Sequence, residues 1–259
     1  MSERSGRESG VPCWVDLSST DVTLSVRFYR EIFGWEAVFD PRPESGGYGR
    51  FTLGGKMVAG IGPSFGDGVP AVWNTYVATR DAEAVASRVR GAGGKVELEP
   101  VKIFDEGSTA AFEDPSGALF MVWQADRRVG AEIVGEPGAL TWNELVTRDP
   151  AVCEAFYRTV FGWEAEGGGT GGGPYTEWWL HGRPVAGTAE PGPVFPPDTP
   201  PHWRACFAVA DAAATVARVL SLGGAVLAPL SPSPRGRMAV VADPQFAPFA
   251  VIEAVTGGR

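Results

Sequence analysis

WVDLSSTDVTLSVRFYREIFGWEA, residues 14–37, is followed later in the chain by WNELVTRDPAVCEAFYRTVFGWEA, residues 142–165. The two stretches share an Asp, a Phe-Tyr-Arg and a Phe-Gly-Trp-Glu-Ala, all at an offset of 128 residues, which is the separation of Trp14 from Trp142. Self-similarity at a fixed spacing is the sequence signature of a duplicated structural unit. We therefore predict that the chain consists of two homologous halves.

The match between the halves continues downstream of these stretches. Four further segments correspond at offsets between 127 and 130 residues: Thr52–Ile61 with Trp179–Thr188, Trp73 with Trp203, Asp81 with Asp211, and Asp114-Pro115 with Asp243-Pro244. These correspondences predict one domain at residues 11–127 and a second at residues 138–256, joined by a linker at residues 128–137. The polar residues 1–10 are expected to form a disordered tail.

The composition argues against nucleic acid and membranes as partners. The 259 residues carry 31 acidic and 22 basic side chains, whereas nucleic-acid binding needs a basic surface. No apolar run approaches the roughly 18 residues of a membrane span. Cys13, Cys153 and Cys206 show no Cys-x-x-Cys spacing, so we expect reduced thiols. We expect a cytoplasmic protein, either a monomer through its internal duplication or a homodimer.

Each half contains one order of predicted elements twice. Asp21 can cap an amphipathic helix that ends at Gly34, and Asp149 followed by Pro150 begins its twin, which ends at Gly162. An alternating strand precedes each helix, and three short strands follow it. A second helix in each half has the same neighbours. The predicted unit is therefore βαβββ, and it occurs four times.

This pattern resembles the glyoxalase/bleomycin-resistance/extradiol-dioxygenase group, the vicinal oxygen chelate superfamily. The resemblance rests on the Asp that caps the helix, on Phe-Tyr-x-x-x-Phe-Gly-Trp at the helix end and on Asp-Pro before the last strand, and it covers nearly the whole chain. It implies an α+β fold in which two βαβββ modules form one domain with a curved mixed sheet around a ligand cleft. The fold hosts both metalloenzymes and metal-free drug-binding proteins, so it does not fix the function.

The resemblance also implies where a divalent metal would be held by His, Gln or Glu. Counting from the capping Asp and from Asp-Pro places other residues there: Trp14, Asn74 and Met121 in the first half, and Trp142, Arg204 and Ala250 in the second. The remaining position falls within residues 56–58 and 183–185. Indole, thioether and guanidinium groups do not bind a hard divalent ion. We therefore predict that the protein holds no metal and no other cofactor.

Two acids lie near these positions. Asp16 and Glu144 follow Trp14 and Trp142 by two residues, so a strand places each acid on the same sheet face as its Trp. Either acid could act as a general base or accept a hydrogen bond from a ligand. Equally, either could be structural, paired with a neighbouring Arg or with backbone amides, because an unpaired buried acid is costly.

The two His residues and the glycine tract give weaker signals. His181 falls in a predicted hairpin turn at the surface, whereas His202 precedes a strand and could line the cleft. Residues 167–173, GGGTGGG, lack the Lys-Ser/Thr of a phosphate loop, and we expect a disordered loop there rather than a lid.

Aromatic side chains dominate the predicted strands. Nine Trp residues are present, and an apolar cleft with a few polar groups suits a flat organic ligand. We predict metal-independent binding of a small, aromatic ligand for sequestration, resistance or an accessory role. The predicted binding residues are Trp14, Asp16, Trp73, Asn74, Met121, Trp123, Trp142, Glu144, His202 and Trp203.

Two alternatives remain open from the sequence. The protein could be a lyase, an isomerase or an oxygenase-type tailoring enzyme of the same superfamily, with Asp16 or Glu144 as the acid or base. It could also be an interaction module whose aromatic faces pack against another chain.

Overall fold

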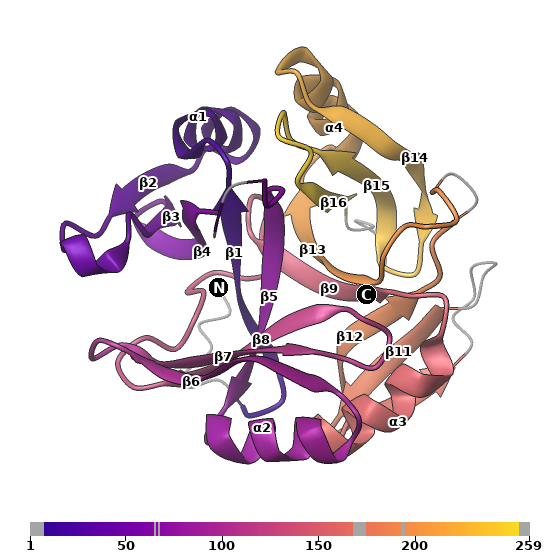
Figure 1. The fold of residues 1–259 in the computed structure, drawn as a ribbon. Coiled ribbons are helices and arrows are strands. Elements are labelled where there is room, and N and C mark those ends of the chain that lie inside the picture. The colour runs from indigo at the N-terminus through magenta and orange to yellow at the C-terminus, as the bar shows by residue number, and fades with distance from the viewer. Residues whose placement is uncertain (1–7, 65, 67, 168–174, 193–194, 254–259) are drawn as a thin grey trace.

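The computed structural model describes residues 8–64, 66, 68–167, 175–192 and 195–253, and it shows one eight-stranded mixed sheet in each half of the chain (Figure 1). Each sheet is built from two βαβββ modules, so the predicted α+β class and the fourfold repeat are confirmed.

The first half supplies ten regular elements and a short 3₁₀ helix at Pro43–Ser45. Its first module consists of β1 (Pro12–Ser19), α1 (Val22–Phe33), β2 (Glu36–Phe39), β3 (Gly49–Leu53) and β4 (Lys56–Pro63). Its second module consists of β5 (Val72–Thr79), α2 (Ala82–Gly91), β6 (Lys95–Ile103), β7 (Gly107–Glu113) and β8 (Leu119–Ala125).

The second half repeats this order. Its first module consists of β9 (Leu140–Val146), α3 (Pro150–Phe161), β10 (Glu164–Gly167), β11 (Tyr175–Leu180) and β12 (Arg183–Ala189). Its second module consists of β13 (His202–Val209), α4 (Ala212–Ser221), β14 (Ala225–Ser233), β15 (Gly236–Ala242) and β16 (Pro248–Glu253). Among the described residues, no helix is both long and apolar enough to cross a membrane.

The two modules of each half meet at their first strands. The strand order is β2-β3-β4-β1-β5-β8-β7-β6 in the first sheet and β10-β11-β12-β9-β13-β16-β15-β14 in the second. Strand β1 runs parallel to β4 and antiparallel to β5, and β9 has the same relation to β12 and β13. Because successive side chains of a strand point to opposite faces of the sheet, every strand contributes side chains to a face covered by helices and to a face without helices.

The helix ends follow from local sequence. The Asp21 side chain accepts a hydrogen bond from the backbone N–H of Leu24 at 2.9 Å, and Gly34 closes α1 at φ +73°, a left-handed conformation that costs glycine little. Asp149 occupies the equivalent N-cap, but its side chain makes no capping hydrogen bond. Helix α3 instead begins with Pro150, whose φ is already helical.

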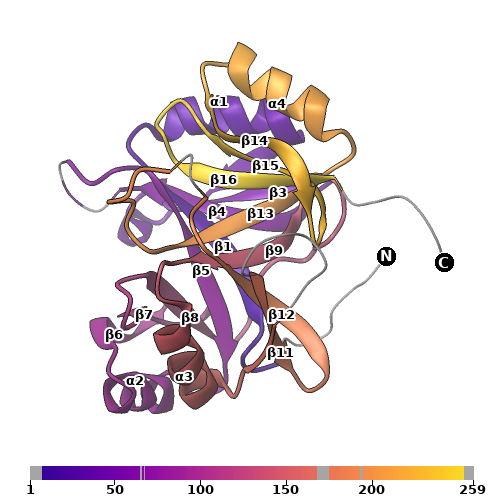
Figure 2. The ribbon, with the colours of Figure 1, turned by 90° about the vertical axis from the view of Figure 1, so that its right-hand side faces the viewer.

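The two large hydrophobic cores each combine one module from each half. The first core joins side chains of α1 and β3, including Phe28 and Phe51, to Phe249 of β16. The second joins the module of α2 to the module of α3, including Phe120 and Phe156. Helices α1 and α4 accordingly lie side by side at one end of the molecule, and α2 and α3 at the other (Figures 1 and 2). Each half therefore buries its helix-covered face against the other half.

The repeated Phe-Tyr and Asp-Pro motifs meet across this boundary. The Tyr29 hydroxyl donates to Asp243 Oδ2 at 3.1 Å, and the Tyr157 hydroxyl donates to Asp114 Oδ2 at 2.9 Å. All four side chains are buried. The motifs that carried the sequence repeat thus hold the two halves together.

Residues 8–10 contact the second half of the chain. Residues 1–7 lie outside the described residues, but the Gly10 carbonyl accepts from Trp163 Nε1 at 2.7 Å, and Glu8 pairs with Arg183 and with His181, the predicted surface turn residue. The prediction of a tail through residue 10 is therefore wrong for residues 8–10, because the second half supplies partners for them. Residues 168–173 of the glycine tract and residues 254–256 also lie outside the described residues.

We expect Tyr29→Phe to lower the free energy of unfolding by about 1–3 kcal/mol, because it leaves the buried Asp243 carboxyl short of a donor. Tyr157→Phe should cost a similar amount through Asp114. Urea denaturation measures both effects, and Leu119→Ala, at an exposed strand position, is the control. A cost for Tyr29→Phe no larger than that of the control would contradict the role of the tyrosine.

Candidate functional site

Strand β1 shows how each sheet divides its side chains. Val15 and Leu17 point into the first core, whereas Trp14 lies in a separate cluster on the helix-free face with Tyr76 of β5. Asp16 shares the face of Trp14, as predicted, because it is two residues further along the strand.

Ion pairs show that both sheets curl around their helix-free faces. Arg50 of β3 contacts Glu106 in the turn between β6 and β7, although four strands lie between β3 and β7 in the sheet. Glu177 of β11 contacts Arg235 in the turn between β14 and β15 at 2.8 Å. We call the two enclosed spaces the first cleft, in the first half, and the second cleft, in the second half.

Asp16 lies in the first cleft as a buried and fully engaged carboxyl group. Its Oδ2 accepts hydrogen bonds from the hydroxyls of Tyr76 at 2.6 Å and Tyr48 at 3.1 Å, and its Oδ1 accepts from Asn74 Nδ2 at 2.9 Å. Burial raises the pKa of Asp16, although these hydrogen bonds and the charge of Arg128 oppose the shift. Burial also raises the pKa of both tyrosines, so both remain donors at neutral pH.

A guanidinium group lies on the indoles of the first cleft. The guanidinium carbon of Arg128 is 4.9 Å from the ring centre of Trp14 and 4.0 Å from that of Trp123, within the range of a cation–π contact. Arg128 Nε donates to Glu106 Oε2 at 2.9 Å, and Trp123 Nε1 donates to the Arg128 carbonyl at 2.5 Å. A fixed cation therefore occupies the face of Trp14, the residue at a family metal position.

Arg128 belongs to the predicted linker, which is attached along the first cleft. The Ala131 N–H donates to the Cys13 carbonyl at 3.0 Å. The Glu132 N–H donates to the Met57 carbonyl at 2.7 Å, and Glu132 Oε2 accepts from the Met57 N–H at 2.6 Å. Ala131 and Val134 pack into the cluster around Trp14. The linker thus forms one wall of the cleft.

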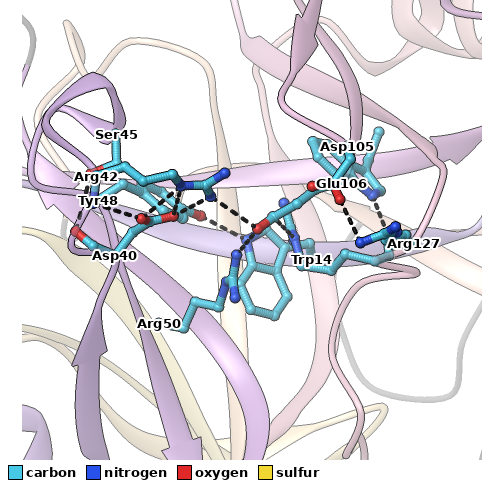
Figure 3. A network of polar contacts seen from close by, with 11 residues as sticks. Trp14, Asp40, Arg42, Ser45, Tyr48, Arg50, Asp105, Glu106 and Arg127 are labelled. Atoms are coloured by element: carbon cyan, nitrogen blue, oxygen red, sulfur yellow. Dashed lines mark hydrogen bonds and ion pairs between the residues drawn. The ribbon is translucent and has the colours of Figure 1, made fainter.

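A cavity of about 320 Å³ remains at the mouth of the first cleft. Figure 3 shows the polar network beside it, in which Glu106 lies between Arg50 and the ion pair of Arg42 with Asp40. Arg42 also lies 3.7 Å above the ring of Phe104. The cavity combines apolar and polar walls, which are formed by Val38, Phe39, Asp40, Pro41, Arg42, Tyr48, Gly49, Arg50, Thr52, Met57 and Glu106.

The second cleft contains a buried ion pair in place of the Asp16 network. Arg204 Nη2 donates to Glu144 Oε2 at 2.5 Å, and the two side chains are only 5% and 3% exposed. Burial acts to lower the pKa of Arg204, but the negative charge of Glu144 holds the pKa above its ordinary value. Glu144 thus matches the structural interpretation of the acid, a carboxylate paired with an Arg.

The second cleft also carries a guanidinium on an indole. The guanidinium carbon of Arg235 is 3.6 Å from the ring centre of Trp142, and its Nη2 donates to Glu177 Oε1. Trp142 Nε1 donates to the hydroxyl of Tyr175 at 2.8 Å, as Trp14 Nε1 donates to Tyr48 in the first cleft at 3.1 Å. Both clefts share this indole–tyrosine pair.

Both clefts have an ion pair at the corresponding place, but the positions of the acidic and the basic side chain are exchanged between the two halves. Arg50 corresponds to Glu177 in the repeat, and Glu106 corresponds to Arg235. In the first cleft the cation is on β3, and in the second it is in the turn. The two clefts therefore have the same frame and a different charge pattern.

The structure brings most of the predicted ligand residues to the clefts. Those on the first cleft are Trp14, Asp16, Asn74, Met121 and Trp123, and those on the second are Trp142, Glu144 and His202. Trp73 and Trp203 are placed wrongly by the prediction, because they lie on the helix-covered face. Their Nε1 atoms donate to the Tyr29 and Tyr157 hydroxyls in the two cores.

Four important residues escaped the sequence comparison. Arg128 comes from the linker, and Arg235 comes from a turn in which the other half has Glu106 instead of an Arg. Tyr48 and Tyr175 do correspond, at the offset of the neighbouring segments. The sequence also has a glycine at corresponding positions of the two halves, Gly60 and Gly187. A Cβ atom at either position would collide with the hydroxyl of Tyr48 or Tyr175, so these glycines could have indicated the two tyrosines.

The side chains at the family metal positions do not form a fitting ligand set. Trp14 and Trp142 present indoles, Asn74 donates to Asp16, and Arg204 brings a cation that repels a metal. Across the described ranges, no three His, Cys, Asp or Glu side chains gather as a metal-binding group would.

Comparison with known proteins finds relatives that match most of the chain. Residues 14–122 match the family described as "Glyoxalase/Bleomycin resistance protein/Dioxygenase superfamily", and residues 139–252 match the "Glyoxalase-like domain" family. The anthracycline biosynthesis protein DauV of Streptomyces sp. (strain C5) is 41% identical, over 94% of this chain and 93% of its own length. DnrV of Streptomyces peucetius, described in the same words, is 40% identical over the same shares.

The fold is also found among solved structures. The Mn(II)-bound glyoxalase from Novosphingobium aromaticivorans superimposes with a TM-score of 0.64 at 17% identity, over 96% of this chain and 86% of that one. The repeated modules, the matched family descriptions and the full-length relatives agree. This chain belongs to the glyoxalase/bleomycin resistance protein/dioxygenase superfamily, as a member with two domains in tandem.

Proposed function

We propose that the protein binds a small, flat, oxygen-bearing aromatic ligand at the mouth of the first cleft, without a metal. The observation that carries this proposal is the cavity that Arg50 helps to line. The Nε atom of the Arg50 side chain is buried and has no hydrogen-bond partner among the described residues. A buried N–H without an acceptor is costly, and an oxygen atom of a ligand would relieve that cost.

The shape and the lining of the cavity support a ligand of this class. Its volume of about 320 Å³ is within the range of small-molecule sites. Val38, Phe39, Pro41 and Met57 give apolar walls, which favour burial of a ring system. The Arg50 guanidinium adds a directed donor at one end.

The names of the relatives agree with such a ligand. DauV and DnrV are described as anthracycline biosynthesis proteins, and anthracyclines are built on a hydroxyanthraquinone, which is planar and rich in acceptor oxygens. A role beside a biosynthetic pathway, as a ligand-binding accessory or a sequestering protein, is consistent with a cleft in which a guanidinium group lies on the indoles of Trp14 and Trp123.

A second candidate function is proton transfer by Asp16 in a tailoring reaction. It is favoured by the raised pKa of Asp16 next to two phenols. Against it, three donors already engage the two oxygens of the carboxyl. Glu144 is a weaker candidate, because Arg204 holds it as a buried ion pair.

We expect Arg50→Lys to weaken binding of alizarin, a dihydroxyanthraquinone, by about tenfold, because lysine keeps the charge near Glu106 but lacks the Nε–H. Thr52→Trp should abolish binding by filling the cavity. Isothermal titration calorimetry measures both. Arg218→Lys is the control, since Arg218 forms an exposed ion pair with Glu31 away from both clefts. Equal affinity in all four proteins would rule out this site.

Treatment with a chelator tests the proposal that binding needs no metal. Dialysis against EDTA should change the affinity for alizarin by less than about twofold, because no step of binding depends on a divalent ion. Native mass spectrometry of the untreated protein reports bound metal at the same time. A stoichiometric divalent ion, with affinity lost on its removal, would overturn metal-independent binding.

Asp16→Asn separates binding from catalysis. The substitution keeps the size of the side chain and removes a proton acceptor that lies among Tyr48, Tyr76 and Asn74. We expect the affinity for alizarin to stay within about threefold, since Asp16 is not among the cavity walls. Liquid chromatography with mass spectrometry follows any conversion of the probe. Conversion by the native protein that disappears in Asp16→Asn would establish the catalytic alternative.

A further inference from the structure

The two ends of the molecule have surfaces of different character. One end carries α1 and α4, and the other end carries α2 and α3 (Figures 1 and 2). Helices α2 and α4 are equivalent elements of the two halves, and each begins after a capping Asp, Asp81 and Asp211. Each residue of α4 can therefore be compared with its counterpart in α2, which lies 130 positions earlier in the sequence.

The exposed side of α4 is apolar, whereas that of α2 is charged. The exposed positions that correspond are occupied by Glu83, Ser87, Arg88 and Arg90 in α2 and by Ala213, Ala217, Arg218 and Leu220 in α4. Arg218 is the one charged residue of α4, and it forms an ion pair with Glu31 of α1. Leu220 is 53% exposed. Helix α4 thus presents apolar side chains to solvent and no unpaired charge.

The edge strand next to each helix shows the same difference. Strand β6 lies at the edge of the first sheet next to α2 and carries the charged residues Lys95, Glu97, Glu99 and Lys102. Strand β14 lies at the equivalent edge next to α4 and carries none. Charged side chains on an edge strand protect a protein against association. Pro229 and Pro232 of β14 lack an N–H group, so we expect contacts through side chains rather than an added strand.

An aromatic side chain projects at the same end of the molecule. Phe246 lies in the loop between β15 and β16, is 73% exposed and has a φ of +65°. A bulky residue rarely adopts this left-handed conformation, because it strains the backbone. The counterpart in the first half is Gly117, which adopts φ +102° without such strain. A glycine in place of Phe246 would therefore suit the isolated chain better than the aromatic residue does.

The loop that carries Phe246 is held firmly. Asp243 Oδ1 accepts a hydrogen bond from the N–H of Gln245 at 2.8 Å. The Gln245 side chain reaches the beginning of α1, where its Oε1 accepts from the Asp21 N–H at 2.6 Å and its Nε2 donates to Ser25 Oγ at 2.6 Å. A side chain on a fixed backbone loses little conformational freedom when a partner covers it. An exposed aromatic ring held in this way is typical of an interaction hot spot.

The same loop adjoins the end of α4. Gly224, three residues after the end of α4, lies so close to Ala242 that a Cβ would be 2.5 Å from the Ala242 carbonyl oxygen. Ala242 ends β15 and directly precedes the loop. The loop therefore lies between the beginning of α1 and the end of α4. We call the exposed apolar side chains at this end the α1/α4 surface, which consists of Ala213, Ala217, Leu220 and Phe246.

Charge favours a second copy of the chain as the partner of this surface. The chain carries a formal net charge of −9, so two copies repel one another through most of their surface. In a two-fold contact, residues near the axis face their own copies, and an acid or a base there would face its like. The α1/α4 surface avoids this repulsion, because Arg218 is already paired with Glu31. At the equivalent surface of α2, Glu83 would face another Glu83.

We propose that two copies of the chain associate through the α1/α4 surface into a symmetric dimer, in which Phe246 and Leu220 of each copy pack against the surface of the other. The contact lies on the outer side of the helices and leaves the helix-free faces of both sheets open. It does not depend on ligand binding in the first cleft.

Sedimentation velocity of the full-length chain over a concentration series tests the dimer. We expect a monomer–dimer equilibrium in the native protein. Phe246→Gly and Leu220→Arg, which introduce the residues found at the counterpart positions, should each weaken the dimer by at least about tenfold. Phe246→Gly should keep the fold, because glycine adopts φ +65° without strain. Leu119→Arg is the matched control, since Leu119 is an exposed apolar residue of the second module, and it should dimerise as the native protein does.

Hydrogen–deuterium exchange locates the contact. On going from dilute to concentrated native protein, we expect slower exchange in α4 and in the loop that carries Phe246. No such change should occur in Phe246→Gly, and thermal unfolding followed by circular dichroism checks that this variant is folded.

Three outcomes would overturn the proposal. The first is a native chain that stays monomeric throughout the series, even if a different protein binds to the same surface. The second is a dimer that neither Phe246→Gly nor Leu220→Arg weakens. The third is a dimer whose formation slows exchange elsewhere and leaves α4 unchanged. Loss of alizarin binding in Arg50→Lys, or its absence in the native protein, has no bearing on any of these measurements.

Discussion

The structure depends on the burial of each helix-covered face against the other half of the chain. The first and fourth modules share one core, and the second and third share the other. The hydrogen bonds of Tyr29 with Asp243 and of Tyr157 with Asp114 join the halves inside these cores. Because both helix-covered faces are used in this way, the helix-free faces are the ones that the contact between the halves does not occupy.

Duplication within one chain has allowed the two clefts to diverge on one frame. Both keep an indole whose N–H reaches a tyrosine hydroxyl, and both have a guanidinium on that indole. The guanidinium comes from the linker in the first cleft and from a turn in the second. The Arg50–Glu106 pair of the first cleft corresponds to the Glu177–Arg235 pair of the second, with the positions of the two charges exchanged.

The positions of charge explain why the acids found in the sequence have different roles. Asp16 is held by neutral donors, whereas Glu144 is held by a buried cation at the position of Asn74 in the first half. A single difference between an amide and a guanidinium thus changes the surroundings of an otherwise equivalent carboxyl. The Asp16 carboxyl therefore accepts hydrogen bonds from three uncharged donors, whereas Glu144 forms a buried ion pair.

The sequence by itself determined the duplication, the βαβββ modules, the helix ends and the face shared by Trp14 and Asp16, because these follow from periods and caps that are local in the chain. The sequence did not show which face of the sheet carries Trp73 and Trp203. Alternation along a strand says only that Trp73 and Asn74 point to opposite faces, and packing in the core decides which face is covered by helices. Arg128 and Arg235 reach the indoles from distant segments. Only the curling of each sheet brings such segments together, and no local pattern records that closure.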